Sequence, residues 1–226
     1  MPIVVSFISQ KGGVGKSTLA RALLAVASHM MRARLADLDP QQASVVEWER
    51  QRHRSGEGPA CEVVAYDSID DAIGHSSDVE LLIVDAPARA NRATLEIAER
   101  SHLVVQPTGA SADDLRPAVL LFHELVKAGI PRQRLVAAIC RILDDTEEAA
   151  ARAYMQAAGY DVLDGAVVER SAYRLAQNRG RAISETKVAK LNQAVDDLMD
   201  ALLQRVTQQL EAQAMQSPSG RRGEAS

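Results

Sequence analysis

The sequence predicts an α/β fold, in which a doubly wound, mostly parallel sheet carries helices on both faces. Short apolar runs alternate with helical stretches along the chain. These runs are continuous and do not alternate with polar residues, which is typical of strands buried on both faces of a parallel sheet. A chain of 226 residues is long enough to build one such domain around a sizeable core.

The expected elements follow one another in strand–helix order. Apolar runs predict strands at 3–8, 34–38, 61–66, 80–84, 102–106, 135–142 and 161–163. Helical periodicity predicts helices at 17–31, 43–54, 68–75, 92–100, 113–128 and 146–158, and a long last helix from near residue 186. Pro40, the Gly/Pro-rich stretch 55–59 and Gly129 separate elements. No linker divides the chain, so we expect a single domain over residues 1–214 and a disordered polar tail over 215–226.

Composition argues against several classes of protein. Aromatic residues make up only 3% of the chain, so stacking on single-stranded bases is not expected as its main activity. Cys61, Cys140 and five scattered histidines form no metal-binding spacing, so we expect reduced thiols and no structural metal. There is no export signal and no apolar run of membrane-spanning length. These features favour a soluble, cytoplasmic protein with no membrane partner.

A glycine-rich segment, QKGGVGKST at residues 10–18, joins the first strand to the first helix. Glycines allow a tight turn that aims N–H groups inward, and the helix N-terminus adds partial positive charge, so the segment is suited to bind phosphates. Lys16 can reach the β- and γ-phosphates, and the Ser17 hydroxyl can ligate Mg²⁺. The residues expected to bind a nucleotide here are Lys11, Gly12, Gly13, Val14, Gly15, Lys16, Ser17 and Thr18.

Acidic residues end two of the expected strands. Asp37 and Asp39 lie in DLDPQQ after the second strand, and Asp85 follows the apolar run LLIV. The carboxyl ends of parallel strands meet at one edge of a doubly wound sheet, so these carboxylates are expected beside the phosphate-binding segment. Asp85 can then hold Mg²⁺ through water, as a Walker B aspartate does.

These motifs together resemble a known family. Gln10 stands where the pattern GxxxxGK[ST] requires glycine, and the segment instead matches KGGxGK[ST], with an additional lysine at Lys11. That is the signature of the deviant Walker class, which includes ParA, MinD, the arsenical-pump ATPase and the nitrogenase iron protein. Two further segments are similar to short ParA partition ATPases: the DxDPQ element at 37–41, and residues 169–186, which resemble R-x-x-Y-x-x-A-x-x-x-G-x-x-[VI]-x-E.

The resemblance implies ATP and Mg²⁺ as cofactors and roles for individual residues. Asp37 would position or polarise the attacking water, and Asp39 would lie near the water shell of the metal. Lys11 would reach into the nucleotide of a partner subunit. Arg141, after the run LVAAIC, is expected to line the adenine pocket. The expected catalytic residues are Lys11, Lys16 and Asp37, and the expected metal-binding residues are Ser17, Asp39 and Asp85.

Basic residues gather in the segment 165–190, where six of them accompany only two acidic residues in a chain of net charge −4. One interpretation is a solvated helix face. The other, implied by the resemblance, is a surface of the ATP-bound dimer that contacts the DNA backbone without reading sequence. The residues concerned are Arg170, Arg174, Arg179, Arg181, Lys187 and Lys190.

The resemblance implies a slow, ATP-switched ATPase. ATP would drive a homodimer that binds double-stranded DNA non-specifically, associates with the nucleoid and positions DNA or other cargo, and a ParB-like adaptor would stimulate hydrolysis. One alternative is a membrane-cycling ATPase similar to MinD. That function needs a basic amphipathic C-terminal helix, which the glutamine-rich segment QRVTQQLEAQAM at 204–215 of this chain matches poorly. An electron-transfer role would need cluster-ligating cysteines, and none follows Asp85 before Cys140. A non-catalytic interaction module would not need Lys16, Asp37 and Asp85.

Overall fold

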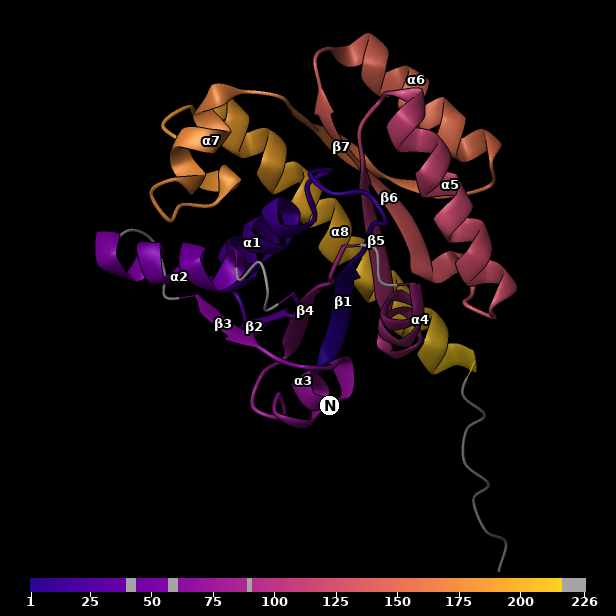
Figure 1. The fold of residues 1–226 in the computed structure, drawn as a ribbon, viewed down its shortest axis with the longest axis horizontal. Helices are drawn as coiled ribbons and strands as arrows, with labels where there is room; N and C mark the ends of the chain where they lie inside the picture. Colours follow the sequence, from indigo (N-terminus) through magenta and orange to yellow (C-terminus); the bar gives the residue numbers. More distant parts are fainter. Residues whose placement is uncertain (40–43, 57–60, 89–90, 217–226) are drawn as a thin grey trace, which may run out of the picture.

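The computed structural model describes residues 1–39, 44–56, 61–88 and 91–216. Its strands are β1 Ile3–Phe7, β2 Ala33–Asp37, β3 Glu62–Ala65, β4 Leu81–Asp85, β5 Leu103–Thr108, β6 Leu135–Ile142 and β7 Asp161–Val168. Within the described ranges they form one seven-stranded sheet in the order β3-β2-β4-β1-β5-β6-β7, and every neighbouring pair is parallel (Figure 1). The predicted doubly wound, parallel α/β fold is confirmed.

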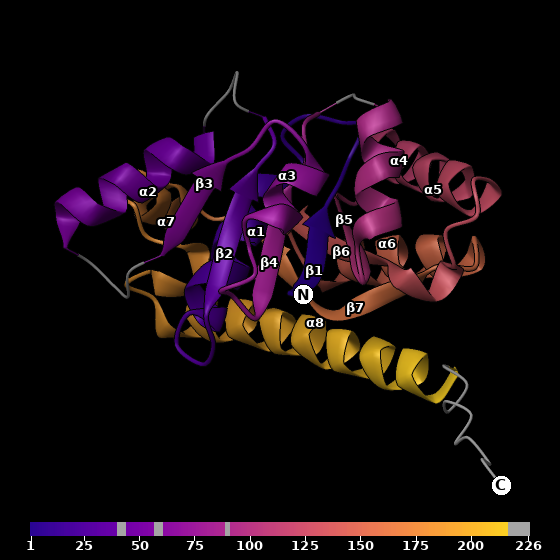
Figure 2. The same cartoon turned by 90° about the horizontal axis from the view of Figure 1, so that it is seen from below.

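Helices cover both faces of this sheet. They are α1 Lys16–Ala27, α2 Ser44–Ser55, α3 Ile69–Gly74, α4 Asn91–Arg100, α5 Ala112–Lys127, α6 Asp145–Ala157, α7 Ser171–Gln177 and α8 Ala189–Gln216, with short 3₁₀ turns η1 Arg132–Arg134 and η2 Ile183–Glu185. Apolar residues of α1, α7 and α8 pack on one face, and those of α3 to α6 pack on the other. Figure 2 shows α8 along one side and α4 and α5 on the opposite side. Successive strand residues such as Val4 and Val5 therefore enter different cores.

The strand order brings the acidic strand ends beside the glycine-rich turn. β1 lies between β4 and β5, so the order of strands reverses direction at this point. Doubly wound sheets bind ligands outside the carboxyl ends of their strands at such a reversal. The parallel register pairs Asp85 with both Phe7 and Asp37. The ends of β1, β2 and β4 thus lie side by side.

Several boundaries differ from the sequence predictions. β7 continues to Val168, past the predicted end at 163, because pairing with β6 resumes after a register shift near Gly165, whose φ is 82°. α8 begins at Ala189 because Thr186 forms a turn, in which its hydroxyl accepts a hydrogen bond from the Val188 N–H. α8 also extends through residues 215 and 216, which the sequence analysis assigned to the tail. Residues 217–226, the expected loop residues 57–59 and the DPQ residues Pro40, Gln41 and Gln42 lie outside the described residues.

No helix within the described ranges combines the length and the apolar character needed to cross a membrane.

Candidate nucleotide site

The turn between β1 and α1 depends on glycine at two positions. Gly13 and Gly15 have φ angles of 75° and 113°, in the left-handed region that other residues rarely adopt. Gly15 is the N-cap of α1 and supplies no side-chain cap. The N–H groups of the first helical turn can therefore bind an anionic ligand, which the helix dipole also favours.

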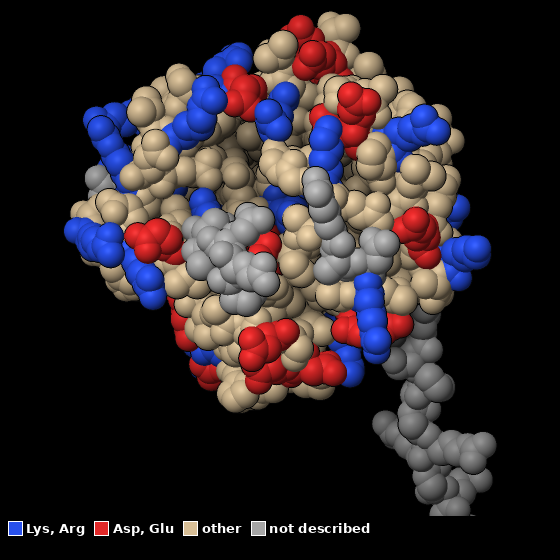
Figure 3. All heavy atoms as spheres, viewed as in Figure 1, with Lys and Arg blue, Asp and Glu red and all other residues tan. Residues whose placement is uncertain are grey.

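A cavity of about 360 Å³ opens at this turn, and Figure 3 shows a hollow in this part of the surface with Lys and Arg side chains around it. The turn and α1 contribute Gly12, Gly13, Gly15, Lys16, Ser17, Thr18 and Leu19. The ends of β2 and β4 contribute Asp39, Asp85, Ala86 and Ala88. The remaining lining residues are Cys140, Arg141, Val167, Val168, Glu169, Arg170, Tyr173, Arg174, Gln177 and Ile183. The cavity thus joins a phosphate-binding end to a wall built from β6, β7, α7 and η2.

Three residues expected at the site are not part of this lining. The side chain of Val14 is buried in the protein, so only its main chain can serve a ligand in the turn. Asp37 is also buried, with 1% of its surface exposed. The ammonium group of Lys11 contacts Asp114 of α5. The other expected nucleotide and metal residues, Arg141 included, do line the cavity.

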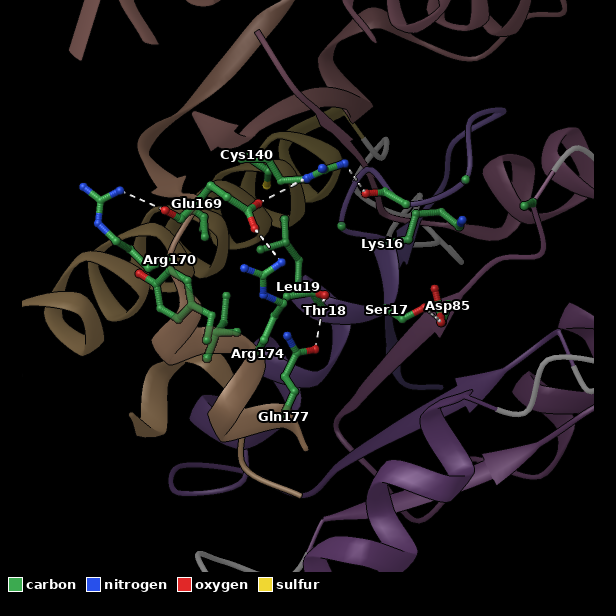
Figure 4. Close-up of a pocket in the computed structure, with 18 of the residues that line it drawn as sticks. Lys16, Ser17, Thr18, Leu19, Asp85, Cys140, Glu169, Arg170, Arg174 and Gln177 are labelled. Atoms are coloured by element: carbon green, nitrogen blue, oxygen red, sulfur yellow. Dashed lines mark hydrogen bonds and ion pairs between the residues drawn. The ribbon is translucent and has the colours of Figure 1, made fainter. Parts of the chain in front are cut away.

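Ser17 and Asp85 form the centre of one end of the cavity. The Ser17 hydroxyl donates a hydrogen bond to Asp85 Oδ2 over 2.5 Å (Figure 4). Asp85 is 3% exposed, and its second oxygen has no hydrogen-bond partner among the described residues. On the neighbouring strand, Asp37 Oδ1 accepts a hydrogen bond from the Asp39 N–H over 2.9 Å, while Asp37 Oδ2 is likewise buried without a partner.

Burial shapes the acidity of both carboxyl groups. Burial raises the pKa of Asp85 to about 6, against the opposing effects of the Ser17 hydrogen bond and the Lys16 charge. Burial also raises the pKa of Asp37, against the hydrogen bond from the Asp39 N–H. A buried carboxylate oxygen without a donor is costly unless a cation or a polar ligand compensates it. The pair is therefore suited to a ligand that brings positive charge.

The donors at this end fit a magnesium ion. Mg²⁺ prefers hydroxyl, carboxylate and water oxygens and is usually held by one or two protein groups together with substrate phosphates. Ser17, Asp85 and the half-buried Asp39 offer such oxygens at one end of the cavity. Across the described parts of the chain, no group of three or more His, Cys, Asp or Glu side chains could hold a metal alone. An ion at this position would thus complete its shell with phosphate oxygens and water.

The opposite end of the cavity has a buried apolar wall with charged groups at its rim. Leu19, Cys140, Tyr173 and Ile183 are each at most 5% exposed, and such a wall suits a flat, weakly polar group such as a nucleobase. Glu169 at the rim contacts the guanidinium groups of Arg141 and Arg174 at 3.3 and 3.9 Å (Figure 4).

Arg141 connects the two ends of the cavity. Its φ is 57°, a left-handed conformation that costs free energy for a residue with a Cβ. The guanidinium donates a hydrogen bond to the Gly13 carbonyl over 2.9 Å and also contacts Glu169. Arg141 therefore links the glycine-rich turn to the end of β7. The sequence analysis expected Arg141 to line an adenine pocket and did not predict this link.

Sequence reasoning missed Arg21 and Gln177. The Gln177 Oε1 accepts hydrogen bonds from Thr18 Oγ1 and Arg21 Nη1, each over 3.3 Å, and so connects α7 to α1. Arg21 lies four residues after Ser17, which places both on one face of α1. That spacing was a usable signal for Arg21. Gln177 had none, because its partner in α1 is 159 residues away.

The basic residues of 165–190 do not share one environment. Arg170 and Arg174 line the cavity, and Arg181 is half-buried with its guanidinium near the Glu185 carbonyl. Arg179, Lys187 and Lys190 are exposed and lie outside the cavity lining, while Arg170 and Arg174 line the cavity and are also exposed to solvent.

A glycine-rich turn at the end of β1, a Ser–Asp pair and a cavity at the strand reversal define a P-loop nucleotide-binding protein of the α/β class. Residues 5–215 match the family model described as the CobQ/CobB/MinD/ParA nucleotide binding domain, and the chain belongs to this family. A search of curated protein sequences finds no match.

Solved structures with the same fold include a plasmid partition protein, a MinC:MinD complex and a ParA family ATPase. A putative plasmid partition protein from Borrelia burgdorferi B31, bound to AMPPNP, superimposes with a TM-score of 0.71 at 16% identity, covering 91% of this chain and 100% of the other. MinD in the MinC:MinD complex of Aquifex aeolicus gives 0.71 at 17% identity, covering 89% and 96%. A ParA family ATPase from Chlorobium tepidum TLS gives 0.68 at 14% identity, covering 89% and 99%. The likeness establishes the shared fold.

Proposed function

We propose that this protein is an ATPase that dimerises when it binds ATP and Mg²⁺, binds double-stranded DNA without sequence preference and positions DNA or other cargo. Membership of the MinD/ParA family supports nucleotide binding. The observation that carries the catalytic part is the pair of neighbouring buried aspartates, each with an unpartnered carboxylate oxygen, next to the phosphate loop.

In this proposal the two buried carboxylates have different roles: Asp85 binds the metal ion and Asp37 acts on the attacking water. Lys16 and the N–H groups of the first α1 turn hold the phosphates. The Ser17 hydroxyl and Asp85 carboxylate hold the metal ion, which neutralises charge on the phosphates when it is bound. Asp37 keeps one oxygen fixed by the Asp39 N–H, so the other can accept a hydrogen bond from the attacking water. Its raised pKa makes it a stronger base than an ordinary carboxylate.

The DNA-binding part rests on the exposed basic residues that lie outside the cavity lining. Arg179, Lys187 and Lys190 are exposed, and phosphate contacts need mobile, solvent-facing cations more than a fixed geometry. Arg170 and Arg174 line the cavity, which favours a role toward the nucleotide for these two. α7 connects the nucleotide site to the exposed basic residues. Its last residue, Gln177, contacts Thr18 of α1, and the exposed basic residues follow α7 in the sequence. Nucleotide binding can therefore affect the orientation of the basic segment.

The test is retention of double-stranded DNA by the full chain at several salt concentrations, with Mg-ATP, with ADP and without nucleotide. We expect retention only with ATP, and a steep loss with rising salt as condensed counterions are released. Lys187→Glu combined with Lys190→Glu should weaken binding to all sequences alike and flatten the salt dependence. The matched control is Arg116→Glu with Lys127→Glu, the same charge change at exposed positions of α5. If the wild type ignores DNA in every nucleotide state, the DNA-binding part is wrong.

A membrane-cycling ATPase is the second candidate, because MinD structures share the fold. Such proteins need a basic amphipathic helix that enters the lipid interface. The described helix α8 carries only two basic residues, Lys190 and Arg205, and Arg205 forms an ion pair with Asp161 over 2.5 Å. Co-sedimentation with anionic lipid vesicles in Mg-ATP distinguishes the two: we expect the protein to stay in the supernatant.

A further inference from the structure

Lys11 points toward the start of α5 and not into the cavity. Its Nζ is 2.5 Å from Asp114 Oδ1 and 3.3 Å from the main-chain oxygen of Asp113. The Lys11 side chain is 43% exposed and that of Asp114 is 18% exposed. The ammonium group is thus held at the surface, with its partner half enclosed.

The start of α5 is built to accept this ammonium group. Asp114 lies in the first turn, where the helix dipole favours a carboxylate. Its second oxygen accepts a hydrogen bond from the Ser111 hydroxyl over 2.7 Å. Pro117 lies four residues after Asp113 and has no N–H, so the Asp113 carbonyl lacks its usual i+4 helical donor and can accept from Lys11. One short segment therefore supplies both a charge and a free acceptor.

We propose that this contact is an intramolecular lock, in which Asp114 and the Asp113 carbonyl compete with the nucleotide of a partner subunit for Lys11. The inference rests on the proposed function, in which Lys11 reaches across the dimer interface. One ammonium group cannot serve both positions, so each dimer forms only after two locks open. Asp114 also accepts a hydrogen bond from the Ser111 hydroxyl, a partner that does not depend on Lys11, so the lock can open without leaving the carboxylate unpartnered.

The lock sets a threshold and does not forbid dimerisation. Partly exposed ion pairs contribute little individually, but a two-fold dimer opens two of them, so their effects on the dimer dissociation constant multiply. The concentration at which ATP drives dimerisation is therefore set in part by the first turn of α5. A second copy of this chain, loaded with nucleotide, is the competitor that opens the lock.

The test compares Asp114→Asn with Asp113→Asn in the full chain. Sedimentation velocity over a range of protein concentrations, with Mg²⁺ and AMPPNP, gives the dimer dissociation constant. We expect Asp114→Asn to lower the dimer dissociation constant about tenfold, because each of the two locks contributes a factor of about three. Asp113→Asn removes the same charge one residue away but keeps the main-chain carbonyl, and its side chain is exposed, so it should match the wild type. Pro117→Ala restores an N–H to that carbonyl and should shift the constant in the same direction by a smaller factor.

The outcomes distinguish a failure of the lock from a failure of the proposed ATP-driven dimer. If the wild type dimerises through Lys11 but Asp114→Asn dimerises no more readily, the lock is overturned. If Asp114→Asn does not fold, Pro117→Ala decides by the same measurement. If the wild type stays monomeric in AMPPNP, or Lys11→Ala dimerises like the wild type, the proposed dimer fails instead. Binding of a fluorescent ATP analogue by dilute monomer should be equal in the wild type and Asp113→Asn.

Discussion

The buried carboxyl group of Asp85 makes the free energy of unfolding depend on pH. Its pKa is raised by burial to about 6, from an ordinary value of 3.8. Without Mg²⁺, the folded state therefore binds a proton that the unfolded state has released, and the folded state loses stability as the pH rises from about 4 to about 6. Asn cannot ionise, so we expect Asp85→Asn to be more stable than the wild type by about 1–3 kcal/mol near pH 7 and equal near pH 4.

Urea unfolding in EDTA at the two pH values measures this difference. Asp67→Asn, at an exposed carboxylate after β3, should equal the wild type at both. Equal stability of Asp85→Asn and the wild type near pH 7 would contradict a costly buried charge.

Lys16 and Asp37 should separate nucleotide binding from hydrolysis. Lys16→Ala removes the main counter-charge to the phosphates, so we expect calorimetry to show no ATP binding. Asp37→Ala should bind ATP but hydrolyse it at least about a hundredfold more slowly, because the carboxylate proposed to act on the attacking water is gone. Asp67→Ala, a carboxylate at the end of the neighbouring strand, serves as the control with unchanged turnover. Loss of ATP binding in Asp37→Ala would show that its role was misassigned.

The end of the cavity at the glycine-rich turn could be predicted because its residues are local in sequence. Gly13, Gly15, Lys16 and Ser17 follow one strand, and their spacing alone implies their arrangement. The base end could not be predicted in the same way. The contact between Arg141 and Gly13 joins residues 128 positions apart and depends on a left-handed residue inside a strand, and no local pattern indicates either feature.

The segment after α7 is positioned by contacts with α2. Arg52 forms a two-pronged ion pair with Glu185, with both distances at 2.6 Å, and donates to the Gly180 carbonyl over 3.0 Å. The Trp48 indole N–H donates to the Arg181 carbonyl over 3.1 Å. Gly180 is needed for this approach, because a Cβ there would lie 2.2 Å from the Arg52 main-chain nitrogen.

Gly180→Ala should therefore disturb both stability and nucleotide affinity. We expect it to lower the free energy of unfolding by about 2–4 kcal/mol, since the backbone of α2 must move, and to weaken ATP binding by displacing α7. Gly56→Ala is the matched control: it has a similar positive φ of 64° but open space around it, so it should cost only about 1 kcal/mol. Thermal and urea unfolding compare the two. Equal losses would show that strain in φ, and not the approach of α2, determines the effect.

At the level of elements, apolar runs and helical periodicity predicted the alternation of strands and helices well. The short helix α7 was not separated from its surroundings, because seven residues are too few for a clear period. Its Gln177 contacts α1, and the segment that follows it contacts α2. Local sequence does not reveal these partners.

For the whole molecule, net charge gave little guidance about partners. The chain is net −4, while the segment 165–190 is basic, and the fold divides that segment between the cavity and the solvent. Sequence spacing could not predict which basic residues line the cavity, because this depends on the contacts of α7 with α1. The six basic residues that were one set in the sequence therefore lie in three environments: two line the cavity, three are exposed outside it and Arg181 is half-buried.

The cavity is assembled from the first, middle and last parts of the chain, since its lining includes residues from the segments 12–19, 85–88 and 167–183. A ribosome completes these parts in that order. A nascent chain that has emerged only through β6 contains the glycine-rich turn and both aspartates but lacks the part of the opposite wall that β7, α7 and η2 supply. If the cavity binds ATP as proposed, full affinity is then a property of the nearly finished polypeptide. We expect chains that end before residue 167 to bind nucleotide more weakly than the full chain, because they lack the lining residues Val167 to Ile183.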